Sequence, residues 1–429
     1  MLTHIRRHHP DVKITGTRQK KTVQLLLPTV LNQPLDTHTN KAKKITEAIG
    51  IYMSSSMRPY SLVEEPGFKY LLHILEPRYN MPSRTHIRQT VVPSIYNQTR
   101  ALMEHELSAA PSVSLTTDGW TSRATESYLT VTAHFIDSEW EMKASVLQTR
   151  PLHEQHTTTH LAEKLQEVVA EWKLERPGTT ISVTTDNAKN IVNAVREAGL
   201  GPHVACFAHT LNLAAQKALA VNQVSRLLGK IRKIVTFFHR STTAAYVLER
   251  KQVALDLPKH CLIHDVSTRW NSSYEMVERY LEQQVAIYSA LTDNTVKNKH
   301  DGSGSRLSDQ EVSFAESVVN IMKPLKTITT ILSTETTPSV SMILPLKTMI
   351  MKSMERNDDD APIVREMKNA IRENLQTRYT DTHLQDFFNK CTALDPRFKS
   401  LPHLDPAHHQ NVFEDITKEV MSRTEQVCI

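Results

Sequence analysis

Cysteine and glycine are scarce in this chain, which has four cysteines and ten glycines among 429 residues. The cysteines lie far apart at positions 206, 261, 391 and 428, without paired spacing. This argues against a disulfide framework and favours an intracellular protein with reduced thiols. With only ten glycines and twenty prolines, the composition also excludes collagen-like and low-complexity chains.

Long apolar runs are absent as well. No stretch is long enough to span a membrane, and the first residues lack the apolar segment of a secretory leader. We therefore expect no membrane partner. What is present is 39% hydrophobic and 23% charged residues, which is typical of a globular protein. At this length, two or three domains are expected.

Positive charge is concentrated at the N-terminus. The whole chain carries a net charge of only +5, but residues 1–44 hold nine lysines and arginines against two acidic residues. A basic arm of this kind binds a polyphosphate such as DNA, or is a solvated tail. Both interpretations remain open from composition alone.

Two short blocks of similar sequence each place an aspartate after a β-branched run. Val113–Thr117 precedes Asp118, and Ile181–Thr185 precedes Asp186. Alternating apolar and small polar residues predict strands, so each aspartate is expected where a strand ends. Strand ends form the ligand crevice of open α/β sheets, and paired carboxylates suit Mg²⁺. The alternative is that Asp186 simply caps the following helix.

The pattern along the chain predicts three structural regions. Residues 41–108 are expected to be helical, with a kink or break at Pro93. The next region is expected to have the order β-β-β-α-β-α-β-α, and residues 220–429 are expected to be almost entirely helical. The predicted elements of the middle region are strands 112–117, 128–136 and 141–149, helix 157–172, strand 180–185, a helix ending at Glu197, strand 203–206 and helix 209–219.

Five blocks stand in the order seen in one known family: TTDGWTS (116–122), TTDNAKN (184–190), CFAHTLNLAAQKAL (206–219), TRWNSSYEMVER (268–279) and ALDPRFK (393–399). The chain resembles hAT-superfamily transposases, and most closely the zinc finger BED domain-containing proteins derived from them. The resemblance implies an RNase H-like core interrupted by a large helical insertion and preceded by a small helical DNA-binding domain. The implied domains are a BED zinc-finger remnant with a basic linker (1–40), a helical DNA-binding domain (41–110), an RNase H-like core (111–222) and a mostly helical insertion domain (223–429).

The resemblance also implies site residues. Asp118 and Asp186 would hold Mg²⁺ while water and then a DNA 3′-hydroxyl attack phosphodiesters, with His209 in support. Locally, Cys206 and His209 are equally explained as a buried thiol and a helix-capping imidazole. Trp270 would stack on an unpaired base, or else belong to the core. Cations implied to contact DNA, each of which is also explained as a solvated surface residue, are Arg269, Lys69, Arg84, Arg88, Lys230 and Lys233.

Two parts of the family pattern are not found in this sequence. His4 and His9 match half of a zinc site, so Zn²⁺ is expected only if a Cys pair precedes them. The third catalytic carboxylate and the dimerisation surface of the family belong to a C-terminal block that is missing here. Glu419 and Glu425 do not lie in its context.

Without the third carboxylate, we favour a domesticated transposase: a nuclear DNA-binding protein without cleavage activity that regulates transcription. The alternative is an active Mg²⁺-dependent DDE-type transposase represented by an incomplete chain, forming a homodimer through the missing block. A generic nuclease fits less well, because of the helical insertion and the missing acid.

Overall fold

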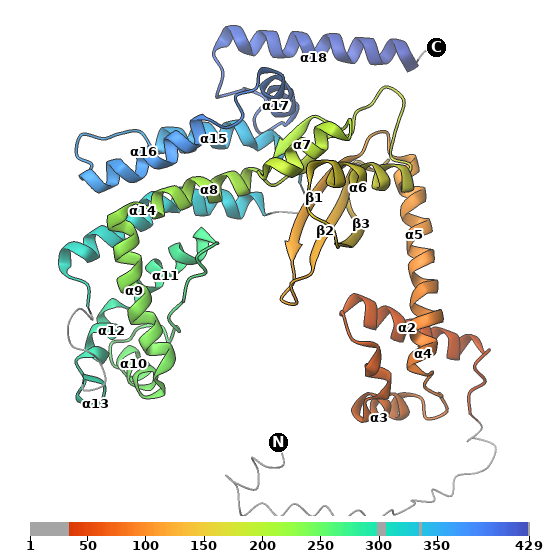
Figure 1. Ribbon diagram of the computed structural model, residues 1–429, viewed down its shortest axis with the longest axis horizontal. Coiled ribbons are helices and arrows are strands. Elements are labelled where there is room, and N and C mark those ends of the chain that lie inside the picture. The colour runs from red at the N-terminus through yellow and green to blue at the C-terminus, as the bar shows by residue number, and fades with distance from the viewer. Residues whose placement is uncertain (1–33, 298–305, 334–336, 428–429) are drawn as a thin grey trace, which may run out of the picture. The chain divides into compact units, whose positions relative to one another are not determined.

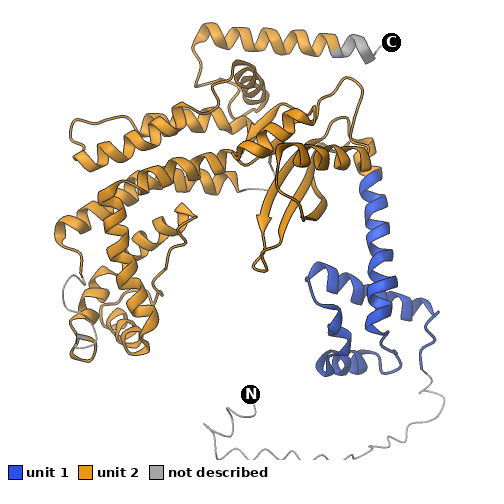
Figure 2. Ribbon diagram, viewed as in Figure 1, with its two compact units in different colours: residues 1–104 blue, residues 105–429 orange. Residues whose placement is uncertain are grey.

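The computed structural model describes residues 34–297, 306–333 and 337–427. The chain divides into two compact units, Met1–Glu104 and His105–Ile429 (Figure 2). His4 and His9, predicted to be a zinc-finger remnant, lie outside the described residues, as does most of the basic arm. No helix in the described ranges combines the length and apolar character needed to cross a bilayer.

The first unit is helical, as predicted (Figure 1). Ile49, Val63 and Ile87 belong to its small buried core, which different helices share. Its elements are α2 (Asn40–Ser55), the 3₁₀ turn η1 (Tyr60–Glu64), α3 (Pro66–Leu75), α4 (Arg84–His86), η2 (Ile87–Val91) and the greater part of α5 (Val92–Ala109).

Pro93 does not break its helix. The helical run continues from Arg84 to Ala109, with a π-helical turn at Ile87–Val91 directly before the proline. Proline lacks an N–H group and its ring collides with the carbonyl four residues earlier. The wider turn, in which the Val92 N–H bonds to the Ile87 carbonyl, absorbs that conflict. The predicted split is therefore wrong, since the helix continues through one bulged turn.

Gly50 is where α2 approaches the bulged helix most closely. A β-carbon at this position would lie 2.6 Å from Ile95 Cδ1 and 2.8 Å from Val91 Cγ1. Both distances are shorter than carbon–carbon contact. The close helix pairing in this unit therefore depends on the missing side chain.

We expect Gly50→Ala to lower the unfolding free energy of the first unit by about 1–2 kcal/mol, because overpacking outweighs the better helix propensity of alanine. Hydrogen exchange across residues 84–104 of the full chain measures this. Gly67→Ala is the control, since nothing lies within 4 Å of its added carbon. Equal exchange in both variants would contradict the packing argument.

The second unit begins with a five-stranded mixed sheet in the order β3-β2-β1-β4-β5. β1, β2 and β3 are antiparallel neighbours, whereas β4 runs parallel to β1 and β5 runs parallel to β4. The predicted β-β-β-α-β-α-β-α order is confirmed. The elements are β1 (Ser114–Thr121), β2 (Ser127–Ile136), β3 (Met142–Leu152), α6 (Thr158–Glu171), β4 (Val183–Thr185), α7 (Lys189–Glu197), β5 (His203–Ala205) and α8 (Phe207–Leu219).

The predicted end of the first strand is wrong. β1 continues through Asp118 to Thr121. The edge of β1 that faces β2 stays paired over this whole length, up to the pair Thr121–Ser127. Only its parallel pairing with β4 stops before the aspartate. β4, in contrast, ends at Thr185 directly before Asp186, as predicted.

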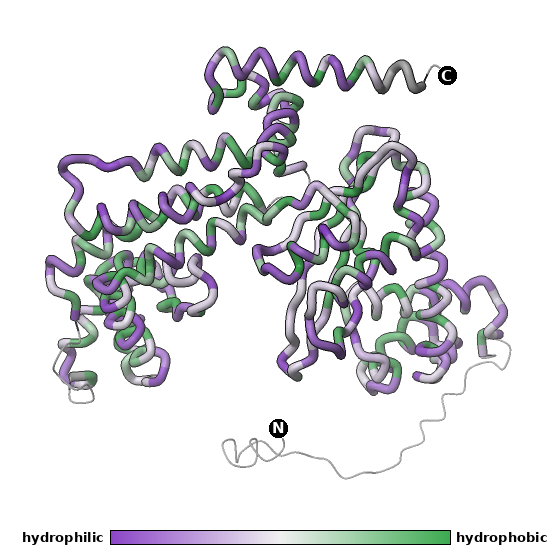
Figure 3. The backbone as a smooth tube through the Cα atoms, turned by 45° about the horizontal axis from the view of Figure 1, so that its top comes forward, coloured by the Kyte–Doolittle hydropathy of each residue, from purple (hydrophilic) through white to green (hydrophobic). Residues whose placement is uncertain are grey.

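The rest of the described chain is helical, as predicted. Hydrophobic and hydrophilic residues alternate along these helices (Figure 3), as in helices with one face in a core. The elements are α9 (Asn222–Arg240), α10 (Thr242–Ala254), α11 (Trp270–Glu282), α12 (Gln284–Leu291), α13 (Asn294–Lys297), α14 (Asp309–Leu332), η3 (Val340–Met342), α15 (Ile343–Ser353), α16 (Pro362–Gln376), α17 (Thr382–Leu394) and α18 (Pro406–Val427).

The last strand, β5, and the helices of this unit share a core. One buried cluster runs from Val204 on β5 through the apolar face of α8 to Phe388 on α17. α8 packs against both α14 and α16, which follow it by about a hundred residues or more. The end of the sheet is therefore shaped partly by residues far along the chain.

Candidate functional site

Asp118 lies on β1 and Asp186 directly follows the neighbouring parallel strand β4, so the two carboxylates are at the same level. The register pairs Leu115 with Val183 and Thr116 with Thr184. Asp118 is two residues beyond Thr116, and Asp186 is two residues beyond Thr184, just past the end of β4. Because neighbouring strands are roughly 4.8 Å apart, this register brings both residues to one edge of the parallel pairing.

Electrostatics show the same proximity. The pKa of the Asp118 carboxyl is raised, first by partial removal from water and then by the negative charge of Asp186. A hydrogen bond from the Gly119 N–H and the charge of His209 act in the opposite direction. The structure thus brings Asp118, Asp186 and His209 within electrostatic reach of one another. A cation between the carboxylates would relieve their repulsion.

Asp186 shapes its own turn rather than capping a helix. Its Oδ1 accepts a hydrogen bond from the Ala188 N–H at 3.0 Å, and its carbonyl accepts one from Thr185 Oγ1 at 2.7 Å. The N-cap of α7 is Ala188, which forms no side-chain cap. The helix-capping alternative for Asp186 is therefore wrong, since its carboxylate closes a local turn before the helix.

His209 lies in the first turn of α8 and is half-buried. Cys206 is at the N-cap position of that helix, and no side-chain cap bond forms there. Asn212 and Gln216 follow His209 at helical spacing on the same face. Asn212 Oδ1 accepts a hydrogen bond from the backbone N–H of Trp270 at 3.4 Å. Gln216 Nε2 donates to the Thr268 carbonyl at 2.8 Å. The segment before α11 therefore lies along the His209 face of α8.

Trp270 belongs to the core. Its side chain is 3% exposed and meets the Tyr274 ring edge-on, with 6.4 Å between ring centroids. A buried indole cannot stack on a base. The predicted stacking role of Trp270 is therefore wrong, and the alternative that it belongs to the core is correct. Arg269, at the N-cap position of α11, is exposed and remains a candidate for contact with DNA.

The other predicted cations differ in their surroundings. Lys230 on α9 forms an ion pair with Glu311, so part of its charge is already compensated. Lys233 on the same helix is exposed. In the first unit, the side chains of Lys69, Arg84 and Arg88 are exposed. All but Lys230 therefore keep the exposure that a phosphate contact requires.

An exposed aromatic pair next to Asp118 was missed by the sequence reasoning. Trp120 is 45% exposed and stacks on Tyr128, with ring centroids 4.7 Å apart and planes inclined by 17°. In a strand, residues two apart share a face, so Trp120 lies on the Asp118 side of the sheet. The TTDGWTS block contained this signal, but only if β1 is extended past its aspartate.

Among the residues that the structure describes, we find no third carboxylate beside the pair. Within the described ranges, no group of three or more His, Cys, Asp or Glu side chains is placed to hold a metal ion. Glu419 on α18 is paired with Lys390 on α17 at 3.0 Å, and the side chain of Glu425 is outside the described part. Carboxylate oxygens such as those of Asp118 and Asp186 are ligands that a hard cation takes.

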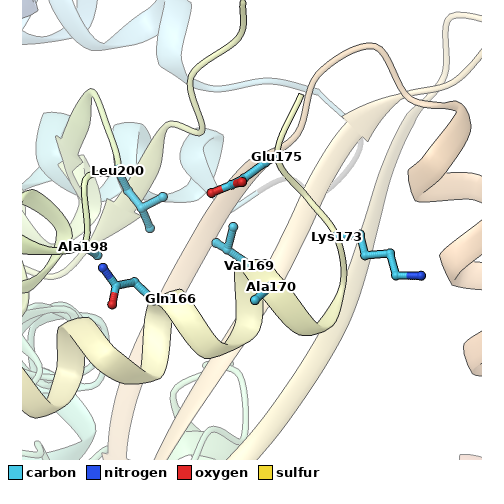
Figure 4. Close-up of a pocket in the computed structure, with 7 residues that line it drawn as sticks. All are labelled: Gln166, Val169, Ala170, Lys173, Glu175, Ala198 and Leu200. Atoms are coloured by element: carbon cyan, nitrogen blue, oxygen red, sulfur yellow. The ribbon is translucent and has the colours of Figure 1, made fainter. Parts of the chain in front are cut away.

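A cavity of about 560 Å³ lies elsewhere in this unit (Figure 4). Its lining comes from the C-terminal part of α6 and from the segments that precede β4 and β5. Asp186 follows β4, so the cavity lies toward the opposite strand ends from the carboxylate pair. It is lined by Gln166, Val169, Ala170, Lys173, Glu175, Ala198 and Leu200.

Comparison with known families gives two adjoining matches. Residues 116–200 match the ZBED1 RNase-like domain, and residues 204–321 match the ZBED1 RNase-like helical domain. The first covers most of the sheet with both aspartates. The second begins on β5 and covers α8 with its histidine.

Curated relatives agree with these matches. Zinc finger BED domain-containing protein 4 of Homo sapiens is 27% identical over 371 residues, covering 84% of this chain and 31% of the relative. Zinc finger BED domain-containing protein 6 of Mus musculus is 26% identical over 409 residues, covering 90% and 40%. The "Putative AC transposase" of Zea mays is 27% identical over 250 residues, covering 55% and 31%. The aligned part of the chain thus spans 31–40% of the length of these three relatives.

The two family models assign the sheet, with both aspartates, and the helices that follow it to an RNase-like class of domains. Within this class, the matches to BED zinc finger proteins and to a transposase identify the chain as a hAT-derived, BED-like protein. The resemblance seen in the sequence blocks is confirmed.

An ion pair fixes the segment that leads to α11. The Asp265 side chain is 1% exposed and accepts hydrogen bonds from Arg232 Nε at 2.7 Å and Nη2 at 2.6 Å. Ser273 Oγ donates to the same carboxylate at 3.0 Å. The Arg232 guanidinium lowers the pKa of Asp265 below its usual range. α9 and α11 are thereby tied together beside Arg269.

We expect Arg232→Met to lower the unfolding free energy by about 2–3 kcal/mol at neutral pH, because a buried carboxylate loses its partner. The partly exposed guanidinium keeps the loss below that of a fully buried pair. The stabilisation exists above the unfolded-state pKa of aspartate and is lost as pH falls through the lowered folded-state pKa. The difference in unfolding free energy between Arg232→Met and wild type should therefore become smaller at acidic pH.

Urea unfolding at neutral and acidic pH measures this difference. Lys233→Met, on the same helix but exposed, is the matched control and should change little. A gap that stays constant from neutral pH to acid would contradict the ion-pair explanation.

Proposed function

We propose that this protein is a nuclear DNA-binding protein, derived from a hAT transposase, that binds DNA without cutting it and regulates transcription. Its relatives are named as BED zinc finger proteins and a transposase, which supports DNA as the partner. The sheet and helical region together would be the RNase H-like core and its insertion, used as a scaffold.

The observation that carries the proposal is the in-register carboxylate pair. Asp118 and Asp186 are both in place, yet the group of carboxylates stops at two among the described residues. Phosphoryl transfer with two metal ions needs bridging and flanking oxygens on both ions. The donor set of the described residues, two carboxylates in register, suits a single cation and supports binding without two-metal cleavage.

A second candidate is an active Mg²⁺-dependent transposase completed by a further part of the protein. The raised pKa of Asp118 favours it, because a carboxyl kept beside a like charge is a frequent sign of a functional site. Asp118 and Asp186 would hold Mg²⁺, which supplies charge stabilisation of the phosphoryl group when bound. A C-terminal block would supply the third carboxylate and the homodimer contact. Zn²⁺ would need a Cys pair before His4 and His9.

Trp120 is the base-stacking candidate that replaces Trp270. Its side chain is 45% exposed and lies on the same side of β1 as Asp118, and Tyr128 stacks on one face of the ring. A rigid, exposed indole beside phosphate-binding groups suits an unpaired base. Arg269, exposed beside the His209 face of α8, would contact the backbone.

Gel-shift binding of labelled duplex DNA with Mg²⁺, scored for nicking, tests the proposed function directly. We expect Asp118→Asn and Asp186→Asn to bind as well as wild type, and no protein to produce nicked product. Mg²⁺-dependent nicking that either substitution abolishes would establish the transposase alternative instead. Absence of any shift at low salt would contradict both.

Trp120→Ala is expected to weaken binding to duplexes with unpaired ends by about 5- to 100-fold, because aromatic stacking contributes ~1–3 kcal/mol per base. Fully paired duplexes should be affected much less. Trp140→Ala is the control, since this tryptophan is 87% exposed in the turn between β2 and β3. Equal losses for both variants, or for both kinds of DNA, would contradict the stacking role.

A further inference from the structure

Tyr379 reaches the end of the sheet from the far helical region. It follows α16, is 6% exposed and has a φ of 57°. Its ring packs edge-on against Phe207 at 5.9 Å and Phe388 at 5.5 Å between centroids. Phe207 begins α8, so the tyrosine is buried where β5 passes into that helix. Neither family match extends to residue 379.

The hydroxyl of Tyr379 ends a chain of hydrogen bonds. It donates to the Ala205 carbonyl at 2.8 Å and lies 3.1 Å from Thr210 Oγ1. Asn187 Nδ2 donates to the same threonine oxygen at 3.2 Å. With one proton per hydroxyl, the bonds run in a single direction: the asparagine amide donates to the threonine, the threonine to the tyrosine, and the tyrosine to the Ala205 carbonyl.

The middle of this series of hydrogen bonds is buried away from water. Thr210 is fully buried, and burial raises the pKa of Tyr379, which keeps the phenol protonated. Removing one member leaves the next without a partner inside the core, which costs more than a surface hydrogen bond contributes. The direction of the bonds therefore specifies where the Asn187 side chain lies.

Asn187 directly follows Asp186, in the turn that the aspartate itself closes. Holding the Asn187 amide fixes one side of this turn. The neighbouring strand fixes the other side, because the Cys206 N–H donates to the Thr185 carbonyl at 2.8 Å. The turn is thus held by Thr210 on α8 and by the backbone of Cys206 directly after β5. The Tyr379 hydroxyl bonds to Thr210 itself and to the carbonyl of Ala205, the residue before Cys206.

We propose that Tyr379 is a positioning residue for the carboxylate pair: through Thr210 and Asn187 it holds Asp186 at the level of Asp118. The inference rests on the proposed role of this pair, but its test requires neither metal nor DNA. It also gives the helical region a second task, since the site would be incomplete without a residue some 170 positions away from its partners.

Tyr379→Phe tests the proposal by removing one oxygen and keeping the ring. We expect hydrogen exchange of the full chain to become about tenfold faster across residues 183–190, with β2 unchanged, because the turn loses its buried anchor. The Asp118 carboxyl, followed by carbon-13 titration, should shift its pKa toward the usual range as Asp186 becomes less restrained. Thr210→Val should reproduce both effects, and the double variant should add little.

Phe388→Leu is the matched control, because it loosens the packing around the same ring and leaves the hydrogen bonds in place. It should not accelerate exchange at 183–190 selectively or move the Asp118 titration. The proposal is overturned if Tyr379→Phe exchanges like wild type, or faster everywhere in step with its stability. It is also overturned if Phe388→Leu gives the same local pattern. If the wild-type protein does not bind DNA, the proposed function is refuted, but the effect of Tyr379→Phe on hydrogen exchange and on the Asp118 titration still tests the positioning role.

Discussion

The parallel pairing of β1 with β4 is the constraint on which the site depends. Its register sets Asp118 and Asp186 side by side, and a shift by one residue would turn one carboxylate to the other face of the sheet. Burial first and the negative charge of Asp186 second raise the pKa of Asp118, so both burial and repulsion act against the ionised pair. The register must therefore be held by the surrounding sheet and helices, and not by the aspartates themselves.

Contacts on both sides of the β1–β4 pair hold this register. On one side, β1 continues past Asp118 against β2, so the aspartate sits in a paired strand and not in a loop. On the other side, β5 and α8 share a core with α14 and α16, and the buried hydroxyls of Thr210 and Tyr379 lie within that core. The helical region that follows the two candidate carboxylates therefore completes the packing beside β5 and α8.

Local patterns predicted much of this arrangement. Alternation in Val113–Thr117 and Ile181–Thr185 placed both strands, and the helical segments followed from their apolar spacing. The failures have physical causes. Pattern reasoning ended β1 at Asp118, because pairing with β2 is a tertiary contact that a single segment does not reveal.

The tryptophans illustrate the same limit, since a motif position does not determine exposure: Trp270 is buried and Trp120 is open. Pro93 was expected to break its helix, but a π turn accommodates it. Tyr379 could not be predicted at all, because its partners are 169 and 174 residues away in the sequence. Contacts of this range depend on the final packing and leave no local pattern.

The central claim is that Asp118 and Asp186 form one electrostatically coupled pair in the folded chain. Carbon-13 titration of the Asp118 carboxyl in wild type and in Asp186→Asn measures this most directly. We predict a pKa above the usual aspartate range in the wild type, and a lower value in the variant, because a neighbouring negative charge has been removed. Identical titration curves in the two proteins would show that the carboxylates do not share a site.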